Sequence, residues 1–212
     1  MANVAYRDHY YYTDTAPGTL GMQTGDLILV LALGGASVTI PAGFTQIGSE
    51  VVNTYYAKLA YRIRQVGDGG NYPGWTNTAY WICSAWSGVD GTNPIVASSF
   101  AGYSADANIP LPSLTASGIA GDAGIYHIMS EGYDSFTPAA NYTERLDPTE
   151  GVTIGDRAGL TASQSTSGTV VSDPATISYV GHIVARSNNT GVVWYDHEGV
   201  APWSSIWRPG RA

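Results

Sequence analysis

The chain has 212 residues, with 9 Lys plus Arg against 17 Asp plus Glu, and a formal charge of -8 at pH 7. Because Lys58 is the single lysine, the chain lacks the basic stripe that phosphate backbones need, and we expect no nucleic-acid binding. Cys83 is also alone, so it forms no internal disulfide and holds no metal by itself. The hydrophobic content of 44% is that of a folded protein with a sizeable core.

Strand patterns begin early in the chain, whereas amphipathic helical periodicity is nearly absent. Residues 27–33 form a continuous apolar run closed by two glycines, which predicts a strand buried on both faces. Residues 37–40 are a shorter candidate that leads into a Pro-Ala-Gly turn. Residues 55–64 alternate between an apolar face and a face that carries Lys58 and Arg62. This alternation predicts a half-buried strand with a basic, solvated outer face.

Three later segments predict central strands. Residues 80–86 carry aromatic side chains on both faces, and residues 125–129 and 177–185 are mostly apolar. Weaker strand candidates are residues 4–12, 142–146 and 157–161. About eight to twelve short strands separated by polar turns are typical of sandwiches and jelly rolls. We therefore predict an all-β fold, a single antiparallel β-sandwich that is jelly-roll-like and spans residues 1–186.

Residues 187–212 differ in character and are predicted to form a C-terminal anchoring extension. Three of the six tryptophans of the chain lie in this segment. Each indole can bury roughly 150–250 Å², and a solvated tail would not carry that much apolar aromatic surface. We predict that the extension docks on its own domain or on a neighbouring subunit, through the partner-binding residues Trp194, Trp203, Ile206 and Trp207.

The sequence offers few groups in the patterns that catalysis requires, and we expect no catalytic residue, no metal ligand and no cofactor. The four histidines are each isolated in sequence: His9, His127, His182 and His197. Without paired spacing they are better read as hydrogen-bonded core or half-buried histidines, although His127 and His182 lie in strands that could be neighbours and so could form a chance metal site. Cys83 lies within an apolar strand, where a thiol is usually inert. A pair of loop carboxylates that cleaves glycosides stays open as an alternative.

Aromatic side chains are the strongest functional hint, and two interpretations fit them. Tyr72 and Trp75 share one loop and are candidate glycan-binding residues, because flat rings stack against the apolar faces of sugars. Tyrosine and tryptophan are also enriched at protein interfaces. Contacts with subunits or with a particle are the preferred interpretation, and glycan contacts are the second.

Five short motifs follow one another along the chain. They are Gly-Asp-Leu-Ile-Leu-Val at 25–30, Thr-Ile-Pro-Ala-Gly-Phe-Thr at 39–45, a tyrosine-rich strand at 55–62, a Ser-Gly-Val-Asp-Gly-Thr-Asn-Pro-Ile loop at 87–95, and Pro-Ala-Ala-Asn-Tyr-Thr-Glu-Arg at 138–145. In this order they resemble a family of β-sandwich proteins common in tailed bacteriophages and related prophage particles. The resemblance covers about residues 20–186. It implies a virion or tail-associated structural protein, used in decoration, fibres or host contact, without enzymatic chemistry.

We therefore expect a non-enzymatic structural component of a phage-like virion, a capsid decoration or a short spike or tail-tip protein. Its expected partners are other virion proteins, from the capsid, spike or tail, and further copies of itself. The alternatives are a carbohydrate-binding adhesin module on host surface polysaccharide and a β-sandwich depolymerase.

Two features of the sequence bear on where the protein is made and found. The amino terminus lacks the pattern of a signal peptide, and the longest apolar run is too short to span a bilayer. We expect synthesis in the host cytoplasm, release by lysis as part of the virion, and no membrane insertion.

Overall fold

The computed structural model describes residues 3–12, 21–69, 72, 74–104, 107–117, 119–131, 135–146, 151–161, 164–172 and 177–189. Within these ranges the chain forms three antiparallel sheets of five, five and three strands, and no helix. The prediction of an all-β, antiparallel fold is therefore confirmed.

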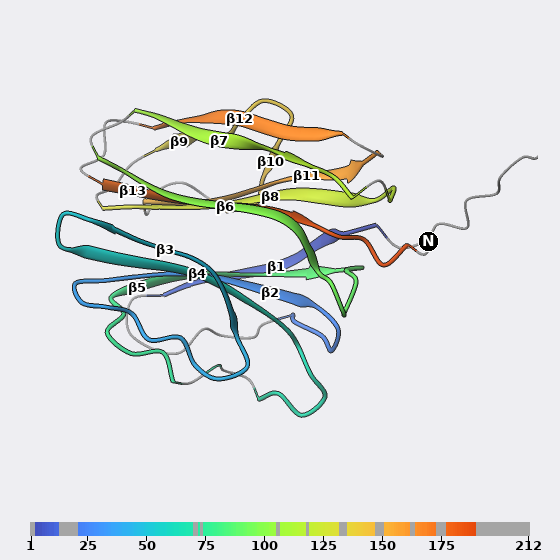
Figure 1. Cartoon of the computed structure of the whole chain (residues 1–212), viewed down its shortest axis with the longest axis horizontal. Helices are drawn as coiled ribbons and strands as arrows, with labels where there is room; N and C mark the ends of the chain where they lie inside the picture. Colours follow the sequence, from blue (N-terminus) through green and yellow to red (C-terminus); the bar gives the residue numbers. More distant parts are fainter. Residues whose placement is uncertain are drawn as a thin grey trace, which may run out of the picture.

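The three sheets are stacked as layers, with the second sheet between the other two (Figure 1). The first sheet has the order β1-β5-β2-β4-β3 and consists of β1 (Ala5–Tyr12), β2 (Leu27–Gly34), β3 (Thr45–Val52), β4 (Tyr55–Ile63) and β5 (Tyr80–Ser87). The second has the order β10-β11-β8-β13-β6 and consists of β6 (Ile95–Ser104), β8 (Asp122–Ser130), β10 (Thr143–Glu144), β11 (Val152–Leu160) and β13 (Ile177–Ala185). The third has the order β7-β12-β9 and consists of β7 (Asn108–Thr115), β9 (Phe136–Thr137) and β12 (Ser165–Ser172).

The connectivity separates the first sheet from the other two. Strands β1 to β5 all lie in the first sheet, and every later strand lies in the second or third. A jelly roll is built from Greek keys, in which a fourth strand returns beside the first of three consecutive strands. In a jelly roll these keys pass back and forth between two sheets, whereas here the first five strands all stay in one sheet. The sandwich-like stacking agrees with the prediction, whereas the jelly-roll connectivity does not.

The strands predicted to be central lie at internal positions of the sheets. β2, predicted from residues 27–33, is buried along its whole length. β5 lies between β1 and β2, and β8 pairs with β13 in the middle of the second sheet. The weaker candidates correspond to β1, to the two-residue β10 and to the end of β11. Residues 37–40 form an isolated bridge from Thr39 to Thr76 in place of a full strand.

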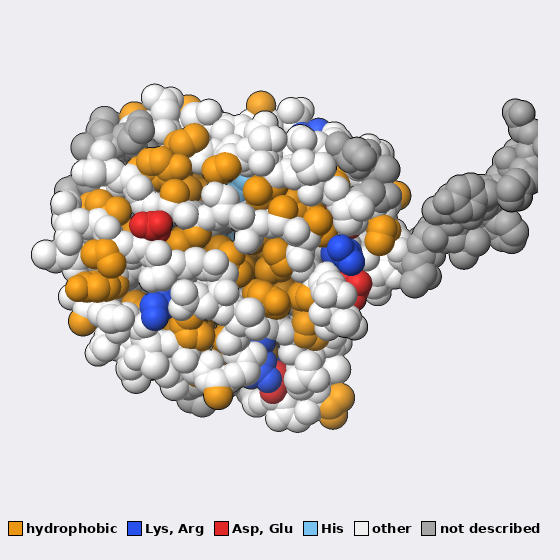
Figure 2. All heavy atoms as spheres, in the orientation of Figure 1, with side chains coloured by type: hydrophobic (Ala, Val, Ile, Leu, Met, Phe, Trp, Pro, Cys, Tyr) orange, Lys and Arg blue, Asp and Glu red, His pale blue; other side chains and the backbone are white. Residues whose placement is uncertain are grey.

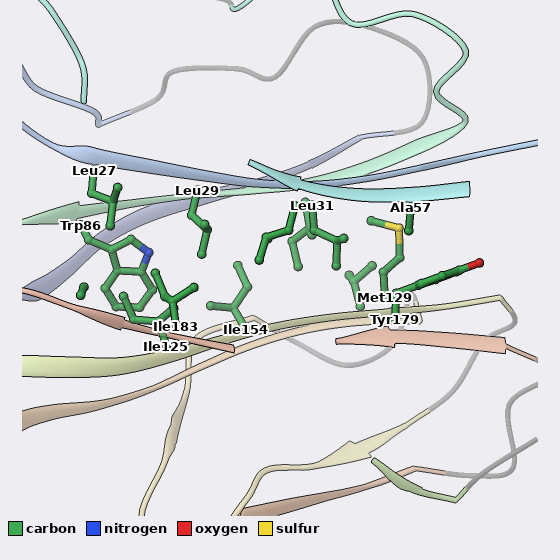
Figure 3. Packing of buried hydrophobic residues seen from close by; sticks show 14 of the residues in the cluster. Leu27, Leu29, Leu31, Ala57, Trp86, Ile125, Met129, Ile154, Tyr179 and Ile183 are labelled. Carbon is green, nitrogen blue, oxygen red and sulfur yellow. The ribbon is translucent and has the colours of Figure 1, made fainter. Parts of the chain in front are cut away.

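The main core fills the space between the two five-stranded sheets (Figure 3). Leu27, Leu29 and Leu31 of β2 point from the first sheet toward the second. The second sheet forms the opposite side of the core with Ile125, Met129, Ile154, Tyr179 and Ile183. Trp86 of β5, in the first sheet, lies at one end of the core. Full burial of each large apolar side chain stabilises the fold by roughly 1.5–3 kcal/mol, so this layer is the principal source of stability.

The outer face of the first sheet is largely covered, so the basic face predicted on residues 55–64 is only partly exposed to solvent. Loops on either side of β3 and β4 bring apolar and aromatic side chains over it, and Ala60 is fully buried there. The side chain of Arg62 is only 17% exposed and pairs with Asp68 at 2.6 Å. Strand periodicity did not reveal this cover because the covering side chains come from loops.

The outer face of the second sheet is covered by the third sheet. Tyr126, Ile128 and Val180 of the second sheet pack against Ile109 and Val170 of the third. The second sheet is therefore buried on both faces, and this explains why β8 and β13 are buried along their full length.

Tyr179 joins the two large sheets through its hydroxyl group. The hydroxyl donates to the backbone carbonyl of Tyr55 at 2.7 Å and accepts from the backbone N–H of Val52 at 3.0 Å. Both partners belong to the turn between β3 and β4 in the first sheet, whereas Tyr179 lies on β13 in the second.

We expect Tyr179→Phe to lower the free energy of unfolding by about 1–3 kcal/mol, because it leaves a donor and an acceptor of the turn without their partner. Urea unfolding followed by far-UV circular dichroism measures this loss. Tyr61→Phe on β4 is the matched control and should change stability by less than about 0.5 kcal/mol. Equal stability of the Tyr179→Phe variant and the unsubstituted chain would show that the hydroxyl does not tie the sheets together.

Candidate functional site

The described ends of the chain meet at one end of the sandwich. The side-chain amide of Asn189 donates to the carbonyl of Ala120 at 2.7 Å and to Oδ1 of Asn3 at 3.4 Å. The N–H of Val4 donates to the carbonyl of Gly121 at 2.9 Å. The amino-terminal strand and the segment after β13 therefore leave the sandwich side by side, at the end where Figure 1 marks the N-terminus.

Asp122, at the start of β8, holds the segment after β13 in place. Its carboxylate is fully buried, and Oδ1 accepts the backbone N–H of Ser187 at 2.8 Å. Its Oδ2 accepts both the N–H and the hydroxyl of Ser117, at 2.8 and 2.7 Å. The N–H of Asn188 donates to the carbonyl of Gly88 at 2.9 Å. A buried carboxylate with three donors is well satisfied, so this junction is rigid.

Gly121 lets these chain segments come together. Its φ of +99° is favourable only for glycine. A Cβ at this position would lie 2.6 Å from both Oδ1 of Asn3 and Nδ2 of Asn189. The junction, defined here as Gly121, Asp122 and residues 187–189, therefore requires glycine next to the aspartate.

The predicted partner-binding residues continue from this junction. Trp194, Trp203, Ile206 and Trp207 lie outside the described residues, and their assignment stays a prediction. The predicted boundary between the sandwich and the extension lies after Arg186. Residues 187–189, the first three residues of the extension, are hydrogen-bonded to the sandwich. The extension therefore starts from a fixed point on the domain.

Tyr72 and Trp75, the candidate glycan-binding residues, lie on the outer face of the first sheet. They are 4% and 7% exposed. The ring of Phe44 contacts both at centroid distances of 5.3 and 5.4 Å, and Trp75 also contacts Trp81 at 5.8 Å. Glycan binding by these two residues stays a prediction, but in this structure neither ring presents an open face for stacking.

His127 is fully buried between the two large sheets. Trp86 donates its indole N–H to Oγ of Ser84 at 2.6 Å, and the same Oγ is hydrogen-bonded to Nε2 of His127 at 2.7 Å. Burial lowers the pKa of His127 to about 3, which keeps the imidazole neutral. A serine paired with a histidine is the start of a nucleophilic site. Here all three side chains are enclosed in the core, and the pair is a structural contact.

His182 lies on the opposite face of the second sheet. Its Nδ1–H donates to the carbonyl of Pro112 at 3.0 Å, and Nε2 accepts the hydroxyl of Tyr142 at 2.8 Å. Burial lowers the pKa of His182 to about 4. β8 and β13 do pair, but His127 lies opposite Gly181, so the two imidazoles face different layers. The prediction that both are hydrogen-bonded core histidines is confirmed.

A polar cluster that the sequence did not reveal closes the sandwich between β1 and β11. The Tyr6 hydroxyl is hydrogen-bonded to Nδ1 of His9, and the guanidinium of Arg145 lies 5.2 Å from the centre of the Tyr6 ring. Arg145 also pairs with the buried carboxylate of Asp156. Burial is the main reason why the pKa of Tyr6 is raised to about 12 and the pKa of His9 is lowered. The raised pKa keeps the Tyr6 hydroxyl protonated, whereas an activated tyrosine would have a lowered pKa.

Cys83 is buried, and burial raises the pKa of its thiol far above the ordinary value. No group of three His, Cys, Asp or Glu side chains among the described residues is placed to hold a metal ion. Nor does the described part of the chain contain a helix long and apolar enough to cross a membrane. No family model, curated protein or solved structure matches this chain.

Proposed function

We propose that this protein is a non-enzymatic structural component of a phage-like virion, a capsid decoration or a short spike or tail-tip protein. The main support for the proposal is the hydrogen-bonded junction at Asp122. It fixes the start of the tryptophan-rich extension at one end of a rigid sandwich. An anchor works best from such a fixed start, because less conformational freedom is lost when it docks.

The amount of aromatic surface in the extension is sufficient for a stable contact. Three indoles that each bury roughly 150–250 Å² remove roughly 450–750 Å² from water. One side of a standard protein interface covers about 800 Å². Trp194, Trp203 and Trp207, with Ile206 between them, would therefore supply most of one side of an interface with a neighbouring subunit.

The buried reactive side chains support a structural role. His127, His182 and Asp122 each use hydrogen bonds to hold strands or segments together. The acidic, lysine-poor composition and the resemblance to virion β-sandwich proteins are independent support from the sequence.

Quantitative mass spectrometry of purified particles tests this proposal. Particles from cells that carry the gene are purified through two density gradients, and the protein is counted against the capsid subunit. Hundreds of copies per particle are expected for a decoration protein, and about three to eighteen for a tail or spike position, given closed symmetry. A protein found in the soluble fraction and missing from the particles would refute the proposal.

A further inference from the structure

The end of the sandwich far from the termini gathers tyrosines and carboxylates. Tyr55 and Tyr80 are the first residues of β4 and β5, and Glu131 directly follows β8. Glu50 lies near the end of β3 and is exposed. We call these four residues the tyrosine end. β13 starts there and finishes beside the junction, and a nine-residue strand spans about 30 Å. Figure 1 shows the turn between β3 and β4 on the side opposite the N-terminus.

Tyr55 and Glu131 are held in fixed positions across the two large sheets. The Tyr55 hydroxyl donates to Oε1 of Glu131, and this bond is the main cause that raises the pKa of Tyr55. The backbone of the same tyrosine is fixed by Tyr179, which donates to its carbonyl. A site whose side chain and backbone are both held binds without a large loss of conformational freedom.

Tyr80 supplies an exposed aromatic ring at the same end of the sandwich. It is 41% exposed, and Leu33 lies opposite both Tyr80 and Ala57 in the strand register. Tyr80 therefore lies on the sheet face that Ala57 and Tyr55 share, toward the second sheet. β4 and β5 are separated by β2, and two strand spacings are about 10 Å. The two tyrosines therefore lie two strands apart on the first sheet, and Glu131 contacts Tyr55 from the second sheet.

These groups have the chemistry that recognises a sugar. A tyrosine ring offers a flat apolar face to the C–H groups of a pyranose, and its hydroxyl offers a polar contact. A carboxylate has about four lone-pair positions, so Glu131 can accept from sugar hydroxyls while it accepts from Tyr55. Glu50 and the net charge of -8 repel acidic ligands. Figure 2 shows an acidic side chain among apolar ones on the β3 side of this end.

We propose that the tyrosine end binds a neutral polysaccharide, with Tyr80 stacking on one sugar ring and Glu131 accepting hydrogen bonds from hydroxyl groups. Because the two tyrosines stand on strands two spacings apart, the bound unit contains at least two sugar rings. This site is separate from Tyr72 and Trp75, whose rings are covered. It lies at the end that an anchor at the junction would leave free.

Affinity electrophoresis of the purified chain tests this site. Native gels contain dextran, mannan or a soluble β-glucan, with hyaluronate as the acidic comparison. We expect at least one neutral polysaccharide to retard the chain, and Tyr80→Ala to weaken that binding about tenfold, as for a residue central to a contact. Glu131→Gln should weaken it several-fold, because the amide accepts fewer hydrogen bonds.

Val171→Ala is the matched control, because Val171 is 45% exposed and lies on the third sheet; it should bind like the unsubstituted chain. Circular dichroism confirms that each variant is folded. Three results would overturn the proposal: no retardation by any neutral polysaccharide, equal retardation of Tyr80→Ala, or capture by polylysine alone, which would indicate a cationic partner. The assay uses the purified chain without particles. Its result therefore does not depend on whether the protein belongs to a virion.

Discussion

Asp122→Ala should lower the free energy of unfolding by about 3–5 kcal/mol, since hydrogen bonds to a charged group contribute about 1.5–3 kcal/mol each and the donors lose their acceptor. The variant leaves the buried N–H of Ser187 and the half-buried N–H and hydroxyl of Ser117 without their acceptor. Urea unfolding measures the change. Hydrogen exchange should also become faster at Ser187 and Asn188 than in the central strands.

Asp122→Asn is the informative comparison for this prediction. Its amide keeps one oxygen for the N–H of Ser187 but places an NH₂ group against the donors of Ser117. A loss smaller than that of Asp122→Ala is expected, with the 187–189 segment still partly protected. If Asp122→Ala were as stable as the unsubstituted chain, the carboxylate would not be what holds the junction.

Acidification from pH 7 to pH 5 should destabilise the fold steeply. His127 and His182 have pKa values of about 3 and 4 in the folded state, below the ordinary value near 6.5. Between these values the unfolded chain binds protons that the folded chain does not, so the free energy of unfolding falls as the pH falls. Each histidine contributes a slope of up to about 1.4 kcal/mol per pH unit, and His9, half-buried with a lowered pKa, adds a smaller share.

Urea titrations at pH 7, 6 and 5 measure this slope. The variant His127→Gln should be less stable at pH 7, because it disturbs the contact with Ser84, but its slope should be shallower by close to one proton. His182→Gln should behave in the same way. A flat profile for the unsubstituted chain, or an unchanged slope when both histidines are replaced, would show that the two imidazoles are not held neutral in the core.

The hydrophobic pattern predicted the strands whose burial is uniform. β2, β5, β8 and β13 lie inside their sheets with cover on both sides, so their sequences are nearly continuous apolar runs. The prediction of hydrogen-bonded core or half-buried histidines holds for His127 and His182, which lie within two of these strands.

Three edge strands, β3, β6 and β7, were missed because glycine and proline interrupt their sequence patterns. A Cβ on Gly48 of β3 would lie 2.4 Å from the Cβ of Phe100, and one on Gly102 of β6 would lie 2.4 Å from Cγ2 of Val52. These glycines let β3 and β6 approach one another, yet they weaken the sequence pattern of a strand. In β7, Pro110 and Pro112 have the same effect, and prolines in strands are confined mainly to edges.

The candidate sites were partly visible in the sequence and partly created by the fold. Composition indicated that aromatic side chains matter, but Tyr72 and Trp75 turned out to be covered while Tyr80 is open. Nothing in the sequence around Asp122 indicates that it fixes the segment after β13, because its Ser187 donor is 65 residues away and comes near only after β8 and β13 pair. Contacts between distant segments carry no local signal.

Co-sedimentation with particles that lack this protein tests the attachment claim most directly. The full chain, its triple variant with Trp194, Trp203 and Trp207 changed to Ala, and Tyr80→Ala are each mixed with such particles and pelleted. The full chain and Tyr80→Ala should pellet to a saturating level, whereas the triple variant should stay in the supernatant although it unfolds at the same urea concentration. If the triple variant pellets as well as the full chain, the carboxyl-terminal tryptophans do not attach the sandwich to a particle.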